Sequence, residues 1–191
     1  MTKNRLEAFS DGVIAIIITI MVLELRVPHG YDLHSLTPLL PVFLSYVFSF
    51  IFLGIYWNNH HHLLHAVQHV DGRILWANLH LLFWLSLIPF ATAWMGENHF
   101  AREPVALYGA VMLFAAIAYS ILVRALLANP MQNSLLRTAL GRDFKGKASM
   151  VILLVAIPLA FVKWWLACAL YLVILIMWLV PDRRIERTVT D

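Results

Sequence analysis

Charged side chains are scarce in this sequence. Asp, Glu, Lys and Arg together make up 13% of the 191 residues, whereas hydrophobic residues make up 61%. A soluble domain is about half apolar and carries about a quarter charged residues. One globule of this length cannot bury so much apolar surface, so the lipid bilayer must act as the solvent for most of it. The composition therefore excludes an ordinary soluble domain and predicts a membrane protein.

Other absences narrow the classes of function. The single cysteine, Cys168, excludes a disulfide framework within one chain and a cysteine-rich metal site. The sequence has no glycine-rich phosphate loop, no helix-turn-helix pattern and no stripe of basic and aromatic residues, so we expect no nucleic-acid partner. Membrane spans use up the length and leave no room for a soluble catalytic domain. We therefore predict no enzyme activity, no cofactor and no soluble partner.

Long apolar runs alternate with short polar connections. This pattern predicts an all-α, polytopic membrane protein with six transmembrane helices in a single domain over residues 1–191. Asp11 and Glu24 bracket the first run and no small-residue cleavage site follows it, which favours a retained span over a signal peptide. The expected spans are residues 8–26, 36–62, 71–95, 104–127, 148–162 and 164–180.

The last apolar region, Ala148–Val180, is too long for one span. Lys163, Trp164 and Trp165 lie near its middle, and a charge beside interfacial aromatic residues is typical of a membrane surface. We therefore expect two short helices, the first of them about 22 Å long. The alternative is a single helix kinked at Pro158, which leaves five spans.

The basic residues are distributed unevenly between the two sides of the expected bundle. Cytoplasmic segments of membrane proteins carry the excess of Lys and Arg, so we expect a multi-pass protein of the cell membrane with both termini in the cytoplasm. Five spans would place the basic C-terminal tail outside. The basic side has Lys3, Arg5, Arg73, Arg137, Arg142, Lys145, Lys147, Arg183, Arg184 and Arg187, and the other side has Arg26, Arg102 and Lys163.

The first span carries polar residues at its entrance. Ser10 and Asp11 need partners within the protein, because an unpaired carboxylate at membrane depth is costly, or they cap the start of the helix. Further along, four residues share one helix face, which on spacing alone indicates ordinary packing or lipid contact. These four residues are Ile16, Thr19, Ile20 and Leu23.

The first span resembles the first-helix signature of the transmembrane protein 175 family. Members of this family are potassium channels of endosomes and lysosomes, with single-repeat relatives in bacteria and archaea. The resembling segments are Arg5…Phe9-Ser10-Asp11-Gly12-Val13…Ala15-Ile16…Thr19…Leu23-Glu24, Trp57-Asn58-Asn59-His60-His61, and Asn78-Leu79…Leu82-Phe83…Ser86-Leu87-Ile88-Pro89-Phe90.

The resemblance implies a potassium-selective channel without the carbonyl filter of ordinary potassium channels, which this sequence also lacks. Family members of this size assemble as homotetramers in the bilayer, with a central pore lined by the first helix of each subunit. The matching pore positions are Ile16, Thr19, Ile20 and Leu23, with Ile16 at the narrowest ring. A ring of isoleucines is a constriction that gates by dewetting, and Thr19 offers hydroxyl oxygens to K⁺, the permeant ion.

The resemblance also implies a structural role for polar residues behind the pore. Arg5, Ser10 and Asp11 are expected to bond to neighbouring helices and hold the first helix at the pore axis. Ala15 stands where some relatives carry serine, which implies weaker selectivity for potassium. The expected partners on the second and third spans are His60, His61, Asn78 and His80.

Five histidines between positions 60 and 69 raise the question of a metal site. His61 and His65 have the helical spacing of zinc-binding pairs, but the run contains no Cys, Asp or Glu, so we expect no metal. Titration near neutral pH is a further possibility for these histidines. The competing functions are a proton-coupled transporter that uses Asp11 and the membrane histidines, and a membrane enzyme with a histidine-bound metal.

Overall fold

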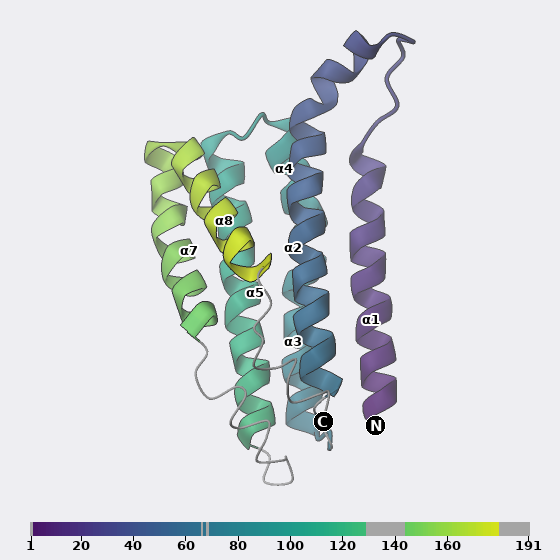
Figure 1. Ribbon diagram of the computed structural model, residues 1–191, viewed down its shortest axis with the longest axis vertical. Coiled ribbons are helices and arrows are strands. Elements are labelled where there is room, and N and C mark those ends of the chain that lie inside the picture. Colours follow the sequence, from purple (N-terminus) through teal and green to yellow (C-terminus); the bar gives the residue numbers. More distant parts are fainter. Residues whose placement is uncertain (1, 66, 68, 129–143, 180–191) are drawn as a thin grey trace.

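The computed structural model of the chain describes residues 2–65, 67, 69–128 and 144–179, and every regular element in these ranges is a helix. This confirms the expected all-α fold class. In chain order the elements are α1 (Lys3–Ile20), η1 (Met21–Glu24), η2 (Leu33–Leu39), α2 (Leu40–His65), α3 (Gly72–Ser86), α4 (Ile88–Glu97), α5 (Arg102–Ala128), α7 (Phe144–Val162) and α8 (Trp164–Leu179). Figure 1 shows the long helices α1, α2, α3 and α5 side by side as a bundle, with α8 inclined to them.

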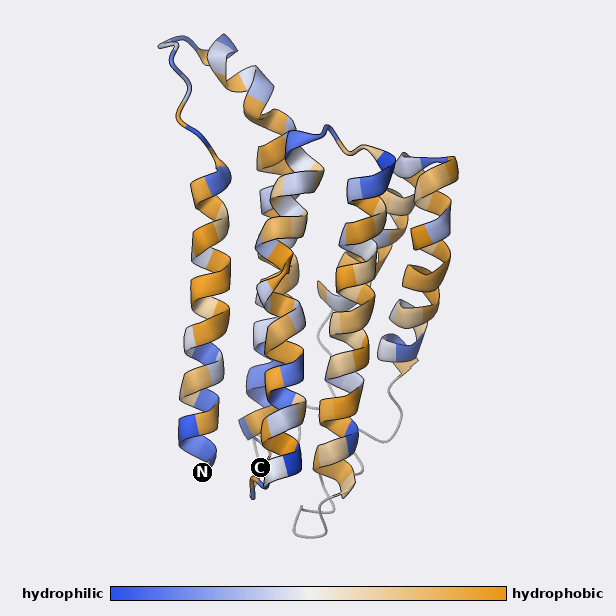
Figure 2. Cartoon of the chain, turned by 180° about the vertical axis from the view of Figure 1, so that it is seen from behind, coloured by the Kyte–Doolittle hydropathy of each residue, from blue (hydrophilic) through white to orange (hydrophobic). Residues whose placement is uncertain are grey.

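The helices have the length and the composition of membrane spans. Five helical stretches in the described ranges are long and apolar enough to cross a bilayer, and α8 adds a shorter apolar helix of 16 residues. A helix suits lipid because it satisfies its own backbone hydrogen bonds. Figure 2 shows hydrophobic residues along most of the length of the bundle. The chain is therefore a polytopic membrane protein.

The first two spans are extended by tighter 3₁₀ turns. The 3₁₀ segment η1 continues α1 without a break, and η2 leads into α2. Asp32 caps η2, because its Oδ1 atom accepts a hydrogen bond from the Ser35 amide at 3.0 Å. The connection between η1 and η2 projects beyond the ends of the other helices (Figure 1).

The third span is divided into two helices. The sequence predicted one stretch over residues 71–95, whereas in the structure α3 ends at Ser86 and α4 begins at Ile88. At the junction, the Leu87 amide bonds to the carbonyl of Trp84, only three residues back, at 3.3 Å. Pro89 in the first turn of α4 has no amide hydrogen and restricts the residue before it, which accounts for a break at this point.

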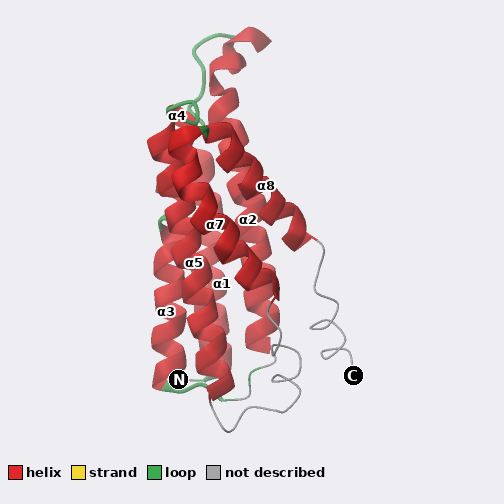
Figure 3. Cartoon of the chain, turned by 90° about the vertical axis from the view of Figure 1, so that its left-hand side faces the viewer, coloured by secondary structure: helices red, strands yellow, loops and turns green. Residues whose placement is uncertain are grey.

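The last described helices form an antiparallel pair. Helix α7 ends at Val162 and α8 begins at Trp164, so only Lys163 lies between them. Pro158 lies inside α7 and does not end it. Figure 3 shows the two helices side by side, with α8 inclined to the bundle.

Helix α5 is the centre of the packed core and contacts α3, α4, α7 and α8. A Cβ atom at Gly109 of α5 would collide with the Tyr171 hydroxyl of α8, so only glycine allows this close approach. The Tyr171 hydroxyl in turn donates to the carbonyl of Val105 at 3.0 Å. By contrast, α1 packs on α2 and α3 at one edge of the bundle (Figure 1).

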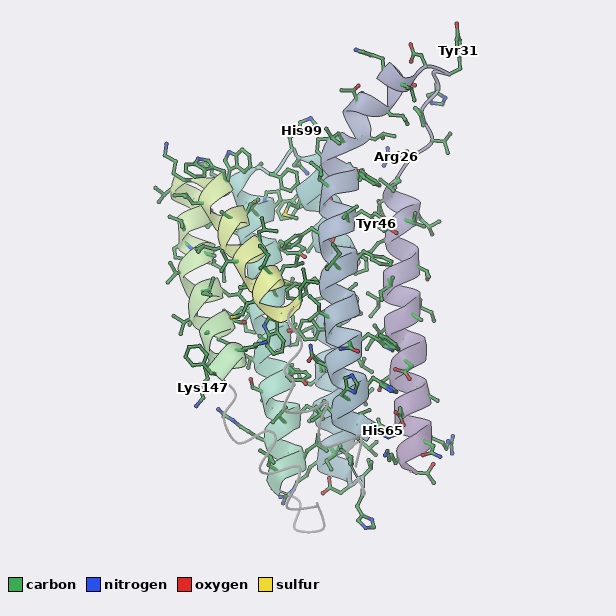
Figure 4. The ribbon with its side chains drawn as sticks, in the orientation of Figure 1. Arg26, Tyr31, Tyr46, His65, His99 and Lys147 are labelled. Carbon is green, nitrogen blue, oxygen red and sulfur yellow. The ribbon has the colours of Figure 1, made fainter. Side chains whose placement is uncertain are left out.

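The N-terminus and the C-terminal end of α2 lie at the same end of the bundle. Lys3 donates to the carbonyl of His65 at 2.5 Å, which places the N-terminus beside the end of α2. Figure 4 shows His65 and Lys147 toward one end of the molecule and Arg26 and His99 toward the other. The basic residues Arg137, Arg142, Arg183, Arg184 and Arg187 lie outside the described residues.

Candidate functional site

Helix α1 has two faces with different surroundings. One face is buried against its neighbours and consists of Leu6, Ser10, Ile14 and Ile17, continued by Met21 of η1. These residues recur every three or four positions, as one side of a helix requires. The remaining side of α1 is largely left open by the chain itself.

The exposed face of α1, continued by Leu23 of η1, contains all four residues predicted to line a pore. Ile16 is 61% exposed, Ile20 41% and Leu23 75%. Thr19 is also exposed, and its hydroxyl bonds to the carbonyls of Ala15 at 2.9 Å and Ile16 at 3.0 Å. The hydroxyl hydrogen is therefore used within α1, and the oxygen lone pairs remain available on the open face.

A buried chain of hydrogen bonds joins α1, α3 and α2. The Asn78 side-chain amide donates to Ser10 Oγ at 2.9 Å, and Asn78 Oδ1 lies 2.7 Å from His60 Nε2. The Ser10 hydroxyl donates to the carbonyl of Leu6 at 2.8 Å. None of Ser10, His60 and Asn78 is more than 1% exposed. We call these three residues the polar network.

The polar network fixes the tautomer of His60. Asn78 Oδ1 is an acceptor only, so His60 Nε2 carries the hydrogen. In the neutral ring His60 Nδ1 is then the acceptor, and it has no hydrogen-bond partner in the described part of the chain. A neutral His60 thus uses its only ring donor to hold Asn78 in the orientation that Ser10 needs.

A second set of contacts joins the N-terminal turns of α1 to α2. The Trp57 indole donates to Asp11 Oδ1 at 3.0 Å, and His61 Nδ1 lies 3.5 Å from Glu7 Oε1. The Trp57 and His61 rings stack at 5.8 Å. Sequence reasoning missed Trp57 and Glu7 as partners. The signal was available for Trp57, because it lies one helical turn before His61 and so shares its face.

Arg5 and His80 lie outside these contacts. Arg5 is exposed, and its side chain makes no hydrogen bond or ion pair with the described residues. His80 Nε2 accepts from the indole of Trp84, one turn further along α3, at 3.0 Å. His80 follows Asn78 by two positions and therefore points to a different side of α3.

The histidine-rich segment does not assemble a metal centre from the residues that the structure describes. His61 and His65 stack with ring centroids 6.1 Å apart. No group of three or more His, Cys, Asp or Glu side chains in the described ranges is arranged to hold a metal ion. Asp11 is bonded to an indole rather than to a histidine, and the carboxylate that lies near a histidine is that of Glu7, 3.5 Å from His61 Nδ1.

Comparisons with known proteins identify relatives of this chain. The family model described as "Endosomal/lysosomal potassium channel TMEM175" matches residues 5–89, the part of the chain that contains most of α1, the polar network and the first two residues of α4. A potassium channel of Chryseobacterium sp. (strain P1-3) is 53% identical over 191 residues, which is 100% of both chains. An endosomal/lysosomal proton channel TMEM175 of Mus musculus is 32% identical over 133 residues, covering 61% of this chain and 27% of its own length.

A solved structure has the same architecture. The crystal structure of a lysosomal potassium-selective channel TMEM175 homologue from Chamaesiphon minutus matches with a TM-score of 0.78 and 30% identity. The match covers 93% of this chain and 96% of that one. The likeness therefore extends over α5, α7 and α8 as well as the segment that matches the family model.

Proposed function

This chain belongs to the TMEM175 family of potassium channels, and on that premise we propose that it conducts K⁺ passively through a pore lined by α1. Conduction of this kind needs neither a catalytic group nor a resident cofactor. K⁺ is the permeant ion. The protein is not an enzyme under this proposal. Its bilayer is the cell membrane, with both termini in the cytoplasm, in keeping with the excess of basic residues at the N-terminal end of the bundle.

The observation that carries the proposal is the division of α1 into a bonded face and an open face. Ser10 is tied to Asn78 and His60 on one side, which fixes the rotation of α1 about its axis. Ile16 and Leu23 consequently project away from the subunit, with 61% and 75% of their surface exposed. One chain leaves this face uncovered, so it must contact either lipid or other copies of α1.

A closed ring of copies turns the open face into the lining of a pore. Cyclic symmetry brings the same helix face of each subunit to a common axis. We propose four copies, the number that the family resemblance implies, and accordingly a homotetramer. The polar network then serves to present the correct face of each α1 to the axis.

Ile16 is the proposed constriction. A ring of apolar side chains in a narrow pore expels water and blocks ions until it widens. Thr19 lies three positions further along on the same open face, where its oxygen lone pairs can replace part of the hydration shell of K⁺. Ile20 and Leu23 continue the apolar lining toward the end of the pore that lies away from the N-terminus.

The alternative, a proton-coupled transporter, has less support. It requires Asp11 and the histidines to exchange protons, whereas Asp11 accepts from Trp57 and His60 donates to Asn78. A transporter gives coupled and saturable flux, whereas a channel gives discrete single-channel current steps in a bilayer. Because the mouse relative is named a proton channel, the recordings should also include a pH gradient.

The test is bilayer recording of the purified protein with potassium opposed to sodium. Ile16→Asn should hydrate the constriction, so we expect a larger current or a smaller preference for potassium. Val151→Asn is the matched control, because Val151 on α7 is also 61% exposed. If Val151→Asn changed the current as much as Ile16→Asn, or if only Val151→Asn did, the assignment of the pore to α1 would be wrong.

A further inference from the structure

The α1 segment ends in a carboxylate at the end of the bundle away from the N-terminus. Glu24 is the last residue of η1 and directly follows Leu23, one of the residues proposed to line the pore. Its side chain is exposed, and it forms no hydrogen bond or ion pair with the residues that the structure describes. No partner in the described part of the chain therefore cancels the field of this carboxylate.

Two other carboxylates at the same end of the bundle are paired with arginine. Glu97 at the end of α4 pairs with Arg26 at 3.3 Å, and Glu103 at the start of α5 pairs with its neighbour Arg102 at 2.7 Å. Arg26 is the basic residue nearest to Glu24 along the chain. The pairing with Glu97 engages its guanidinium on another helix, so the charge of Glu24 is left uncompensated.

Helix stability does not account for a carboxylate at this place. The C-terminal end of a helix carries partial negative charge, which favours Lys or Arg there and disfavours Asp or Glu. Neither α1 nor η1 has a basic residue in its last turn, and Glu24 adds a full negative charge to that of the last carbonyls. A residue that breaks a local rule without a compensating contact is typical of a functional position.

We propose that Glu24 determines the preference of the pore for cations at the mouth away from the N-terminus. This role rests on the proposed function, because only an assembled pore brings the Glu24 side chains of several copies around one opening. Rings of Asp or Glu side chains favour cations over anions in channels. Glu24 is thus a specificity-determining residue, separate from the apolar constriction at Ile16.

The carboxylate acts through its field and needs no contact with the ion. A helix with its side chains is about 10–12 Å across, so Glu24 lies within about that distance of a lumen lined by α1. The Debye length is about 10 Å at 0.1 M salt and about 3 Å at 1 M salt. The Glu24 carboxylates should therefore raise the local concentration of K⁺ at low salt and have little effect at high salt.

Single-channel recording of the full-length protein in symmetric KCl tests this role. Glu24→Gln removes the charge and keeps the volume, so it should reduce the current about threefold at about 0.1 M salt and little at about 1 M. The reduction should be larger at the voltage polarity that drives K⁺ in from the Glu24 side, which changes the ratio of the currents at the two polarities. In a KCl gradient, the reversal potential should move toward the equilibrium potential of chloride. Glu24→Asp keeps the charge and should behave as the wild type.

Glu103→Gln is the matched control. It removes the same charge at the same end of the bundle, but from the start of α5, which packs on α3, α4, α7 and α8. We expect its current to equal that of the wild type at both salt concentrations. Equal reductions in Glu24→Gln and Glu103→Gln, or a reduction in Glu24→Gln that does not depend on salt, overturn the proposal. A changed elution volume of Glu24→Gln in size exclusion would assign Glu24 a structural role and would also overturn it.

Ile16→Asn in the same recordings separates this role from the proposed function. If Ile16→Asn changes the current and Glu24→Gln does not, the pore assignment stands and the role of Glu24 is wrong. If neither substitution changes the current, the assignment of the pore to α1 is wrong and the role of Glu24 fails with it.

Discussion

The two halves of the bundle are held together by different means. Helices α1, α2 and α3 are joined through buried polar side chains, with Ser10, His60 and Asn78 at most 1% exposed. Helices α5, α7 and α8 are joined through small residues, such as Gly109, and through Tyr171, whose hydroxyl bonds to a backbone carbonyl. The first half is tied by a chain of buried polar side chains from three helices, whereas in the second half the close contact at Gly109 is accompanied by the hydrogen bond from Trp178 to Ser149 at 2.9 Å.

This difference follows from what each half must specify. In lipid, apolar packing can hold helices together without hydrogen bonds between them, because small residues let the backbones approach closely. It specifies the rotation of a helix less strictly than directional hydrogen bonds do. Helix α1 needs a defined rotation under the proposed function, and the polar network provides it. Polar groups inside a membrane are costly, so a buried polar network that reaches α1 points to a functional role for this helix.

The largest effect is expected from Asn78→Leu in the polar half. Leucine removes the donor to Ser10 and the acceptor of His60, and each buried polar group left unsatisfied costs about 1–3 kcal/mol. We expect a loss of about 2–5 kcal/mol in stability, which lowers the temperature at which the protein unfolds in detergent. The measurement is fluorescence-detected size exclusion after heating.

Asn98→Leu is the matched control for this change. The Asn98 side chain is exposed and bonds only to the carbonyl of Trp94, one turn back, at 2.8 Å among the described contacts. Its loss should therefore move the unfolding temperature little. If the two substitutions had equal effects, the buried bonds would not distinguish the two halves.

The next largest effect is expected from Gly109→Ala in the packed half. The added methyl group collides with the Tyr171 hydroxyl, so α8 must shift or the bond to Val105 must break. Forcing an extra carbon into a close-packed site costs about 1–3 kcal/mol. Thermal unfolding with the same readout should show a drop close to that of Asn78→Leu or somewhat smaller.

Gly54→Ala provides the comparison within a helix. A Cβ atom at Gly54 has no neighbour within 4 Å, and alanine favours a helix over glycine by about 0.5–1 kcal/mol. We expect Gly54→Ala to be neutral or stabilising. A destabilisation as large as that of Gly109→Ala would mean that close packing against Tyr171 is not the cause.

Hydropathy was sufficient to predict the fold class, because charged residues are confined mostly to the ends of the apolar runs. It could not reveal the break at Leu87, since both sides of that residue are equally apolar. Pro89, two positions further on, was the available signal. Proline ends or redirects a helix through its missing amide hydrogen, which a hydropathy average does not record.

The polar network was predicted only as a set of residues. Which of Ser10, His60 and Asn78 meet depends on the relative rotation of three helices, and spacing along one helix does not give this rotation. His80 could have been separated from Asn78 by its spacing of two positions. Whether the open face of Ile16 contacts lipid or a pore stays a prediction, because an apolar side chain suits both.

Tyr171→Phe isolates one hydrogen bond in the packed half. The substitution keeps the ring against Tyr108, at 5.9 Å between centroids, and removes only the donor to the carbonyl of Val105. We expect a loss of about 1 kcal/mol, the usual net contribution of one hydrogen bond. A loss as large as that of Asn78→Leu would show that α8 also depends on polar bonds, and the contrast between the halves would fail.

The smallest effect on stability is expected from Arg26→Gln, which tests the attachment of the chain just after η1. Arg26 bonds to Glu97, at the end of α4, at 3.3 Å, and the two side chains are 81% and 45% exposed. Exposed ion pairs contribute little because water and salt screen them, so we expect a change below about 0.5 kcal/mol. Arg102→Gln is the control, since Arg102 pairs with its chain neighbour Glu103 and ties no two helices together. A larger loss of stability for Arg26→Gln than for Arg102→Gln, one that shrinks as salt is raised, would contradict this expectation. It would mean that the buried polar network is not sufficient to hold α1, and that the chain just after η1 needs the ion pair with Glu97.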